Sequence, residues 1–130
     1  MTQAGTPEGE LTVLRGQVRH PVEKLECFPA PESVTQVSFT TDEVTSMCPV
    51  TGQPDFSSVT IEYEPDRRCI ESKSLKLYLW SFRDHGIFAE GLAAAIAAEV
   101  NRAAEPTRVR VTVTQHVRGG IVTEATDELP

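Results

Sequence analysis

The stretch TRVRVTVTQ, residues 107–115, alternates polar and apolar residues over four periods, with its valines in phase. A period of two places every second side chain on one face of a β-strand. The stretches TQVSFTT at 35–41 and SSVTIEYE at 57–64 show the same alternation. The chain therefore has to form a sheet with an apolar face, and a second layer has to cover that face.

Two helices are predicted between the second and third of these strands. The first lies within residues 74–84 and has Ser72 or Ser74 available as its N-cap. The second follows Gly86 and continues to about Asn101 in an alanine-rich context. The apolar residues that recur at helical spacing are Leu75, Tyr78, Leu79 and Phe82 in the first helix, and Phe88, Leu92, Ile96 and Val100 in the second.

The glycine pair Gly119 and Gly120 predicts a turn into a last short strand near 121–126. The order of elements is then strand, strand, helix, helix, strand, strand. This order predicts an α+β fold with a four-stranded antiparallel sheet and two helices on one face. Such a sheet has two open edges, so we expect further copies to pair with them in a homo-oligomer.

The length of 130 residues fits one domain. The first thirty residues are rich in proline, glycine and charge, and four prolines break any regular pattern there. We therefore predict an extended N-terminal arm over residues 1–32 and a single catalytic domain over residues 33–130.

The formal net charge of -7 argues against a general nucleic-acid or anionic-membrane binder, because both use excess Lys and Arg to meet phosphate. No apolar run approaches the roughly 20 residues of a membrane-spanning helix. The opening MTQAGTPEGE lacks the basic and hydrophobic regions of a signal peptide. We expect a soluble, cytoplasmic protein that contacts neither nucleic acid nor membrane directly.

The three cysteines, Cys27, Cys48 and Cys69, are far apart and form no C-x-x-C pair. This pattern indicates neither a disulfide framework nor a zinc site, so we expect reduced thiols and no metal. Cys27 and Cys69 are interpreted as small buried residues.

The segment SMCPVTGQPDF, residues 46–56, places Cys48 seven residues before Asp55. A cysteine is nucleophilic as its thiolate, and an aspartate within reach can exchange protons with a substrate held on sulfur. Pro54 and Gly52 allow the loop to reverse direction and return Asp55 toward Cys48. The spacing alone fits an ordinary turn equally well, so it favours no chemistry by itself.

The segment ESKSLKLYLWSFRDHG, residues 71–86, concentrates positive charge in an acidic chain. Cations and an aromatic ring on one helical stripe can hold a phosphate-bearing cofactor, and Ser72 and Ser74 add hydroxyls at the helix start. A solvated basic face is the alternative. The residues on the stripe are Lys73, Lys76, Trp80 and Arg83.

Together these two segments resemble the 7-cyano-7-deazaguanine reductase family, QueF, a nitrile reductase family of queuosine biosynthesis, which is a tRNA modification. The resemblance extends over roughly residues 33–125, and the length is similar to the short, single-module form. The block ESKSLKL is specific to this family and is associated with NADPH binding. The resemblance implies the tunnelling fold (T-fold) shared with GTP cyclohydrolase I. In that fold, subunits join their sheets into an oligomeric barrel, and the sites form between subunits.

The resemblance also implies a mechanism. Cys48 would attack the nitrile carbon of 7-cyano-7-deazaguanine to form a covalent thioimide, and Asp55 would protonate the nitrile nitrogen. Two hydrides from two NADPH molecules would then yield 7-aminomethyl-7-deazaguanine, without a metal.

Further site residues follow from the same resemblance. Glu90 would bind the amide and amine edge of the deazaguanine, with Glu71 and Ser72 as further substrate contacts. The expected cofactor contacts are Lys73, Ser74, Lys76 and Arg118. Each has a plain structural alternative: Glu90 can decorate a first helical turn, Glu71 can pin the loop before its helix, and Arg118 can be an exposed hairpin residue.

The sequence departs from the family pattern at Ala89, where many members have a histidine before the glutamate. That histidine is thought to position or protonate the substrate, so its role is in doubt here. His85 or His116 could supply it, or it could be absent.

Two other functions stay open. One is the related amidino-transferring enzyme of archaeosine synthesis, which captures the same nitrile but adds ammonia and needs no NADPH. The intact Lys73 and Lys76 argue against it, because that branch lacks the cofactor block. The other is a noncatalytic binding or assembly module, against which the pair Cys48 and Asp55 argues.

Overall fold

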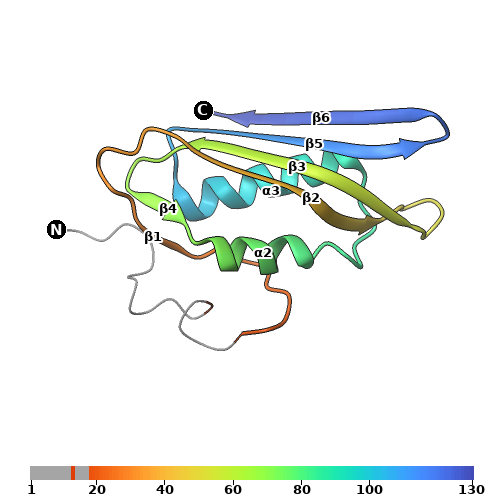
Figure 1. Ribbon diagram of the computed structural model, residues 1–130, viewed down its shortest axis with the longest axis horizontal. Helices are drawn as coiled ribbons and strands as arrows, with labels where there is room; N and C mark the ends of the chain where they lie inside the picture. The colour runs from red at the N-terminus through yellow and green to blue at the C-terminus, as the bar shows by residue number, and fades with distance from the viewer. Residues whose placement is uncertain (1–12, 14–17) are drawn as a thin grey trace.

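The computed structural model describes residue 13 and residues 18–130 (Figure 1). The predicted order of the six main elements and the α+β class are confirmed. The four long strands form one antiparallel sheet in the order β2-β3-β5-β6. Their bounds are Val37–Met47 for β2, Pro54–Glu64 for β3, Arg108–Arg118 for β5 and Ile121–Leu129 for β6.

Two helices lie on one face of this sheet, as predicted (Figure 1). The first, α2 (Ser72–Trp80), lies beside β2, and the second, α3 (Ala89–Ala104), packs against β5 and β6. Past Trp80 the chain tightens into successive turns, in which the N–H groups of residues 81–83 donate three positions back. The first helix is therefore shorter than predicted, since these tighter turns replace its last helical turn.

The N-cap of α2 is Glu71, so the prediction of Ser72 or Ser74 was wrong. The Glu71 carboxylate accepts hydrogen bonds from the backbone N–H groups of Lys73 and Ser74, both at 2.8 Å. Two of the unpaired donors at the helix start are thereby satisfied, and the negative charge suits the helix dipole.

A second, two-stranded sheet was not predicted. It pairs β1 (Cys27–Pro29) with β4 (Arg68–Ile70) in antiparallel register. The Tyr63 hydroxyl of β3 accepts a hydrogen bond from Ile70 N at 2.8 Å, which fastens this small sheet to the large one.

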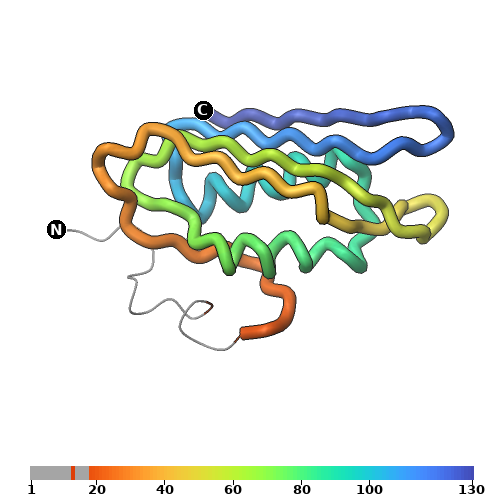
Figure 2. Tube along the Cα trace, in the orientation of Figure 1, coloured from red at the N-terminus to blue at the C-terminus, as the bar shows by residue number. Residues whose placement is uncertain are grey.

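The last part of the arm predicted over residues 1–32 packs against the domain. Leu25 and Cys27 belong to the hydrophobic core. Figure 2 shows this segment passing beside α2, where Val22 N donates to Leu77 O at 3.2 Å and Glu26 N to the Ser74 hydroxyl at 3.0 Å. Apolar side chains on an otherwise polar segment explain its docking. Residues 1–12 and 14–17 of the predicted arm lie outside the described residues.

The core lies between the sheet and the two helices. The valines of β5 that alternate in the sequence are fully buried, which confirms the inward face predicted for that strand. On α3, alanines such as Ala93 and Ala97 are at most 1% exposed. Small side chains on this face let the helix backbone approach the sheet closely. Within the described part of the chain, no helix is long and apolar enough to cross a membrane.

The alanines of α3 provide a matched test of this packing. Ala97 is fully buried against the sheet, whereas the next residue, Ala98, is exposed. We expect Ala97→Leu to lower the free energy of unfolding by about 1–3 kcal/mol, because the added side chain has no space. Ala98→Leu should change it by less than about 0.5 kcal/mol. Urea unfolding followed by Trp80 fluorescence measures both, and equal effects would contradict this orientation of the helix.

Candidate active site

The turn between β2 and β3 presents Cys48 at one end of the sheet. Cys48 directly follows β2, and its backbone N–H donates to Gln53 O at 2.8 Å. Its carbonyl accepts from Gly52 N at 2.8 Å, so the turn closes through both backbone groups of the cysteine. Gly52 has φ of 71°, a conformation that glycine adopts without steric cost. The turn predicted between Cys48 and Asp55 is therefore present.

Asp55 lies near the start of β3, opposite Ser46 of β2. It is in phase with the buried residues of β3 and is itself only 2% exposed. The last residue of β5, Arg118, places its Nη1 2.6 Å from Asp55 Oδ1. Among the described residues this buried oxygen receives no well-directed hydrogen bond, so the Arg118 guanidinium is its charge partner.

The Cys48 thiol is held in surroundings that favour its ionised form. Hydrogen bonds from the Thr51 hydroxyl, the Thr51 and Val50 N–H groups and the Arg118 guanidinium lower the pKa of Cys48 from 9.0 to about 7, against a smaller opposing effect of burial. Arg118 therefore contacts both Cys48 and Asp55, and the structure brings the three residues together. Arg118 was predicted to contact a cofactor phosphate, and that role stays a prediction; in the structure its guanidinium contacts Cys48 and Asp55.

The other two cysteines have the opposite environment. Burial raises the pKa of Cys27 to about 12, and burial also raises the pKa of Cys69. Both are free and buried, as expected for small core residues. Only Cys48, of the three, is poised for nucleophilic chemistry near neutral pH.

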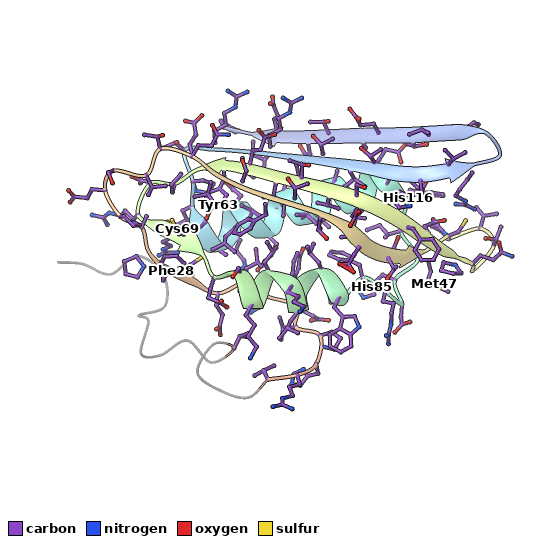
Figure 3. The ribbon with its side chains drawn as sticks, in the orientation of Figure 1. Phe28, Met47, Tyr63, Cys69, His85 and His116 are labelled. Atoms are coloured by element: carbon purple, nitrogen blue, oxygen red, sulfur yellow. The ribbon has the colours of Figure 1, made fainter. Side chains whose placement is uncertain are left out.

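The start of α3 is fastened to the same end of the sheet. Met47 N donates to His85 O at 2.7 Å, and Ile87 N donates to Met47 O at 3.1 Å. These bonds form a parallel bridge between Met47 and Gly86, directly before Cys48. Figure 3 shows Met47, His85 and His116 at this end of the molecule.

Glu90 follows this bridge closely and lies exposed in the first turn of α3. The N-cap, Phe88, makes no side-chain capping bond, so the charge of Glu90 at the helix start is favourable. The preceding Ala89 is buried. Of the two histidines considered in its place, His85 packs its ring edge-on against Phe82 at 5.7 Å, and His116 lies exposed on β5.

The ESKSLK block lies on α2, and its residues differ in availability. Glu71 is 7% exposed and uses both carboxylate oxygens for its cap. Ser74 is fully buried, with its hydroxyl 3.0 Å from Glu26 N, which donates to it, and 2.8 Å from Glu71 O, which accepts from it. Ser74 stays a predicted cofactor contact, and its hydroxyl and N–H groups are already hydrogen-bonded within the chain. Ser72 is exposed.

Two cationic residues of the block remain available beside a groove. Lys76 is exposed, and Lys73 donates from Nζ to Val13 O at 3.0 Å. Both border a groove of about 680 Å³ between α2 and the edge strand β2, together with Trp80 and Arg19. Arg83 lies beyond the end of α2, so it does not share the predicted helical stripe, but its guanidinium lies 5.7 Å from the centre of the Trp80 ring. Cations beside an aromatic ring in a groove fit a phosphate-bearing dinucleotide.

The start of this block lies far from Cys48. Glu71 and Ser72 line a mostly apolar cavity of about 570 Å³ together with Tyr63, Phe28 and Cys69. In Figure 3 these last three residues lie at the end of the molecule opposite Met47. Tyr63 and Asp55 are both on β3, and eight residues of strand span about 26 Å. Within one chain, the cysteine end and the Glu71 cavity therefore lie apart, at opposite ends of the sheet.

Large apolar side chains border the cysteine end. Monomeric proteins seldom expose so many large apolar side chains in one region, and such a cluster is typical of an interaction surface. Three of them lie within two residues of Cys48, Asp55 or Glu90, and the other three lie in or beside the hairpin that contains Arg118. All are more than half exposed: Val50, Phe56, Phe88, Val117, Ile121 and Val122.

Three residues of the site were missed from the sequence. Thr51 donates hydrogen bonds to the Cys48 thiol, and Ser46 and Ser57 are buried beside Asp55 on the core face of the strands. The sequence alternation could have identified the two serines. They occupy inward positions of their strands, where apolar residues are expected, and buried polar groups on such a face indicate a functional pocket. Within residue 13 and residues 18–130, no group of three His, Cys, Asp or Glu side chains could hold a metal.

The chain is similar in sequence to one family of known proteins. The family model described as QueF-like protein matches residues 54–128. A protein of Alkalilimnicola ehrlichii named NADPH-dependent 7-cyano-7-deazaguanine reductase is 46% identical over 110 residues, which cover 83% of this chain and 85% of that protein. A protein of the same name from Syntrophus aciditrophicus is 46% identical over 123 residues, 92% of this chain and 88% of that protein.

A solved structure, the apo form of the archaeosine synthase QueF-Like, matches this chain with a TM-score of 0.71 and 28% identity. The match covers 76% of this chain and all of that chain. It confirms the predicted fold class, the T-fold arrangement of a four-stranded sheet with two helices on one face.

The differing pKa values of the cysteines predict selective alkylation. At pH 7.5 and under native conditions, iodoacetamide should modify Cys48 before the other two cysteines. The thiolate is the reactive form, and the pKa of the Cys48 thiol is about 7. Peptide mass spectrometry identifies the modified cysteine. The rate should rise with pH through about 7 and then level off. Earlier labelling of Cys27 or Cys69 would contradict the assigned environments.

Proposed function

The chain belongs to the QueF-like family, and we propose that it reduces the nitrile of 7-cyano-7-deazaguanine to 7-aminomethyl-7-deazaguanine with NADPH, for queuosine biosynthesis. The observation that carries this proposal is the grouping of Cys48, with its pKa of about 7, beside the buried Asp55 and its ion-pair partner Arg118. Nitrile capture needs a nucleophile and a proton donor at one place. Two relatives that share 46% identity with the chain carry the reductase name.

In the first step Cys48 attacks the nitrile as its thiolate. The sulfur forms a bond to the nitrile carbon, one π bond of the C≡N group breaks, and the nitrogen takes up one proton to give a thioimide. Asp55 can pass that proton from solvent to the nitrogen, since its Oδ1 is buried and lacks a directed hydrogen bond. The step consumes the one proton that ionisation of the thiol released.

Reduction of the thioimide to the amine and the Cys48 thiolate requires two hydrides and one further proton, and two NADPH molecules supply the hydrides when bound. The chain's own contribution is the groove beside α2, where Lys73 and Lys76 would hold the cofactor's phosphates and Trp80 would pack against one of its rings. The bond between carbon and the Cys48 sulfur breaks between the two hydride steps, which returns the thiolate.

Substrate recognition would use residues of both regions, the cysteine end and the Glu71 cavity. Glu90, exposed near Cys48, would accept hydrogen bonds from the amide and amine edge of the deazaguanine. Ser72 and Glu71 border the apolar cavity at the opposite end, which is large enough for part of a planar ring system. Because about 26 Å of strand separates these ends, one chain does not complete the site.

A second copy of the chain would complete it. The strands β2 and β6 are the two edges of the sheet, and both leave backbone groups available for pairing. The exposed apolar residues around the cysteine end provide a surface for such a neighbour to cover. We therefore place the active site between subunits of a homo-oligomer in which sheets join edge to edge.

The amidino-transferring function is the second candidate, because the solved archaeosine synthase shares the fold. It would use the same cysteine to capture the nitrile, followed by ammonia instead of hydride. The exposed Lys76 and the groove beside α2 favour the reductase, since amidino transfer has no use for a dinucleotide site.

Incubation with 7-cyano-7-deazaguanine and NADPH distinguishes the two. We expect two NADPH oxidised per nitrile consumed, measured by absorbance, because nitrile to amine is a four-electron reduction. Without NADPH the protein should gain the mass of one nitrile substrate, and Cys48→Ala should abolish this gain, whereas Cys27→Ala, at a buried core cysteine, should leave it intact. An unmodified wild-type protein would contradict the nucleophile. Adduct formation without NADPH oxidation would favour amidino transfer.

A further inference from the structure

Arg118 links the two chemical groups of the cysteine end. Its Nη1 lies 2.6 Å from the buried Asp55 Oδ1, and its guanidinium also donates a hydrogen bond to the Cys48 thiol. The Arg118 side chain itself is 43% exposed, whereas Asp55 is 2% exposed. One cation at the surface thus contacts one buried carboxylate and one thiol at the same time.

The fold holds Arg118 at this place by an irregularity of β5. The regular pairing of β5 with β6 ends at Gln115, and the register shifts before Arg118 pairs with Ile121. Such a shift bends a strand and re-aims the side chains beyond it. The turn that follows consists of Gly119 and Gly120, with φ of 58° and 78°, so the hairpin is tight and Arg118 sits at its base.

We propose that Arg118 is a positioning residue for nitrile capture, which holds the Cys48 thiolate and the Asp55 carboxylate side by side before substrate arrives. Without the cation that contacts both groups, the Asp55 carboxylate would disfavour the thiolate, and the pKa of Cys48 would be higher. The guanidinium is suited to this task because its fork can donate to two acceptors at once. The cofactor role expected from the sequence does not require this geometry.

The other ionisable groups at this end do not supply the same effect. Asp55 from β3 and Glu90 from α3 are carboxylates, which oppose a thiolate. His85, before α3, packs against Phe82, and His116 lies exposed on β5. Among the described residues of these elements, Arg118 is the group whose charge acts in favour of ionised Cys48.

The proposal rests on the proposed function, because it concerns the same cysteine, but its test needs no nitrile. The rate of Cys48 alkylation by iodoacetamide is measured against pH by intact mass, for wild type, Arg118→Gln and Arg118→Lys. The matched control is Arg110→Gln, which removes a cation of β5 that pairs with Glu128 away from the site.

Arg118→Gln should raise the midpoint of the pH profile and slow alkylation at pH 7 about three- to tenfold, since less thiolate is present. Arg118→Lys should restore part of the rate, and Arg110→Gln should match wild type. A wild-type profile for Arg118→Gln, or equal shifts in Arg118→Gln and Arg110→Gln, would overturn the proposal. If Arg118→Gln does not fold, the Arg118→Lys profile decides. A midpoint raised above the wild-type value supports the positioning role, because lysine keeps the charge but lacks the fork that donates to two acceptors, and an unchanged midpoint overturns it.

The positioning role of Arg118 and the reductase activity can fail independently of each other. A wild-type protein that forms no nitrile adduct would refute the reductase while its alkylation profile still reported on Arg118. An intact adduct with an unshifted Arg118→Gln profile would refute the positioning role alone.

Discussion

The two backbone hydrogen bonds of Met47 are the contact on which the arrangement of the site depends. They fasten the last residue of β2 to the segment 85–87 and so tie the sheet to the start of α3. Cys48 follows directly on one side of this bridge, and Glu90 follows within one helical turn on the other. Since backbone groups form the bridge, it ties the segments that carry Cys48 and Glu90 to each other without using the side chains of residues 85–87.

Arg118 balances the charge of the buried Asp55 at this end. The apolar core of the sheet gives way here to buried polar residues, and Asp55 would be an isolated buried charge without its partner. Arg118 reaches it from β5 and at the same time stabilises the thiolate of Cys48. One residue therefore makes a buried carboxylate tolerable and a cysteine reactive, which explains why the hairpin of β5 and β6 is part of the site.

The large elements were predictable because their residues alternate or repeat over several periods. The strand predicted at 35–41 in fact continues to Met47, and the reason is a register shift between Thr41 and Val44 that interrupts the alternation. The strands β1 and β4 have three residues each, too few to show any period. The turn from Cys48 to Asp55 was readable from its glycine and proline. The contact of Arg118 with Cys48 and Asp55 could not be predicted, because it depends on the pairing of strands that are far apart in the sequence.

The central claim is that the site is divided between two copies of the chain, since Cys48 and the cavity at Glu71 and Ser72 lie at opposite ends. Two variants test this most directly: Cys48→Ala removes the nucleophile, and Ser72→Trp fills the cavity. Each should be inactive alone. When the two are unfolded together and reassembled, an interface between them contains one intact site, so NADPH-dependent nitrile reduction should return to a measurable fraction of wild type. A mixture that stays inactive, or a fully active Ser72→Trp variant, would contradict the claim.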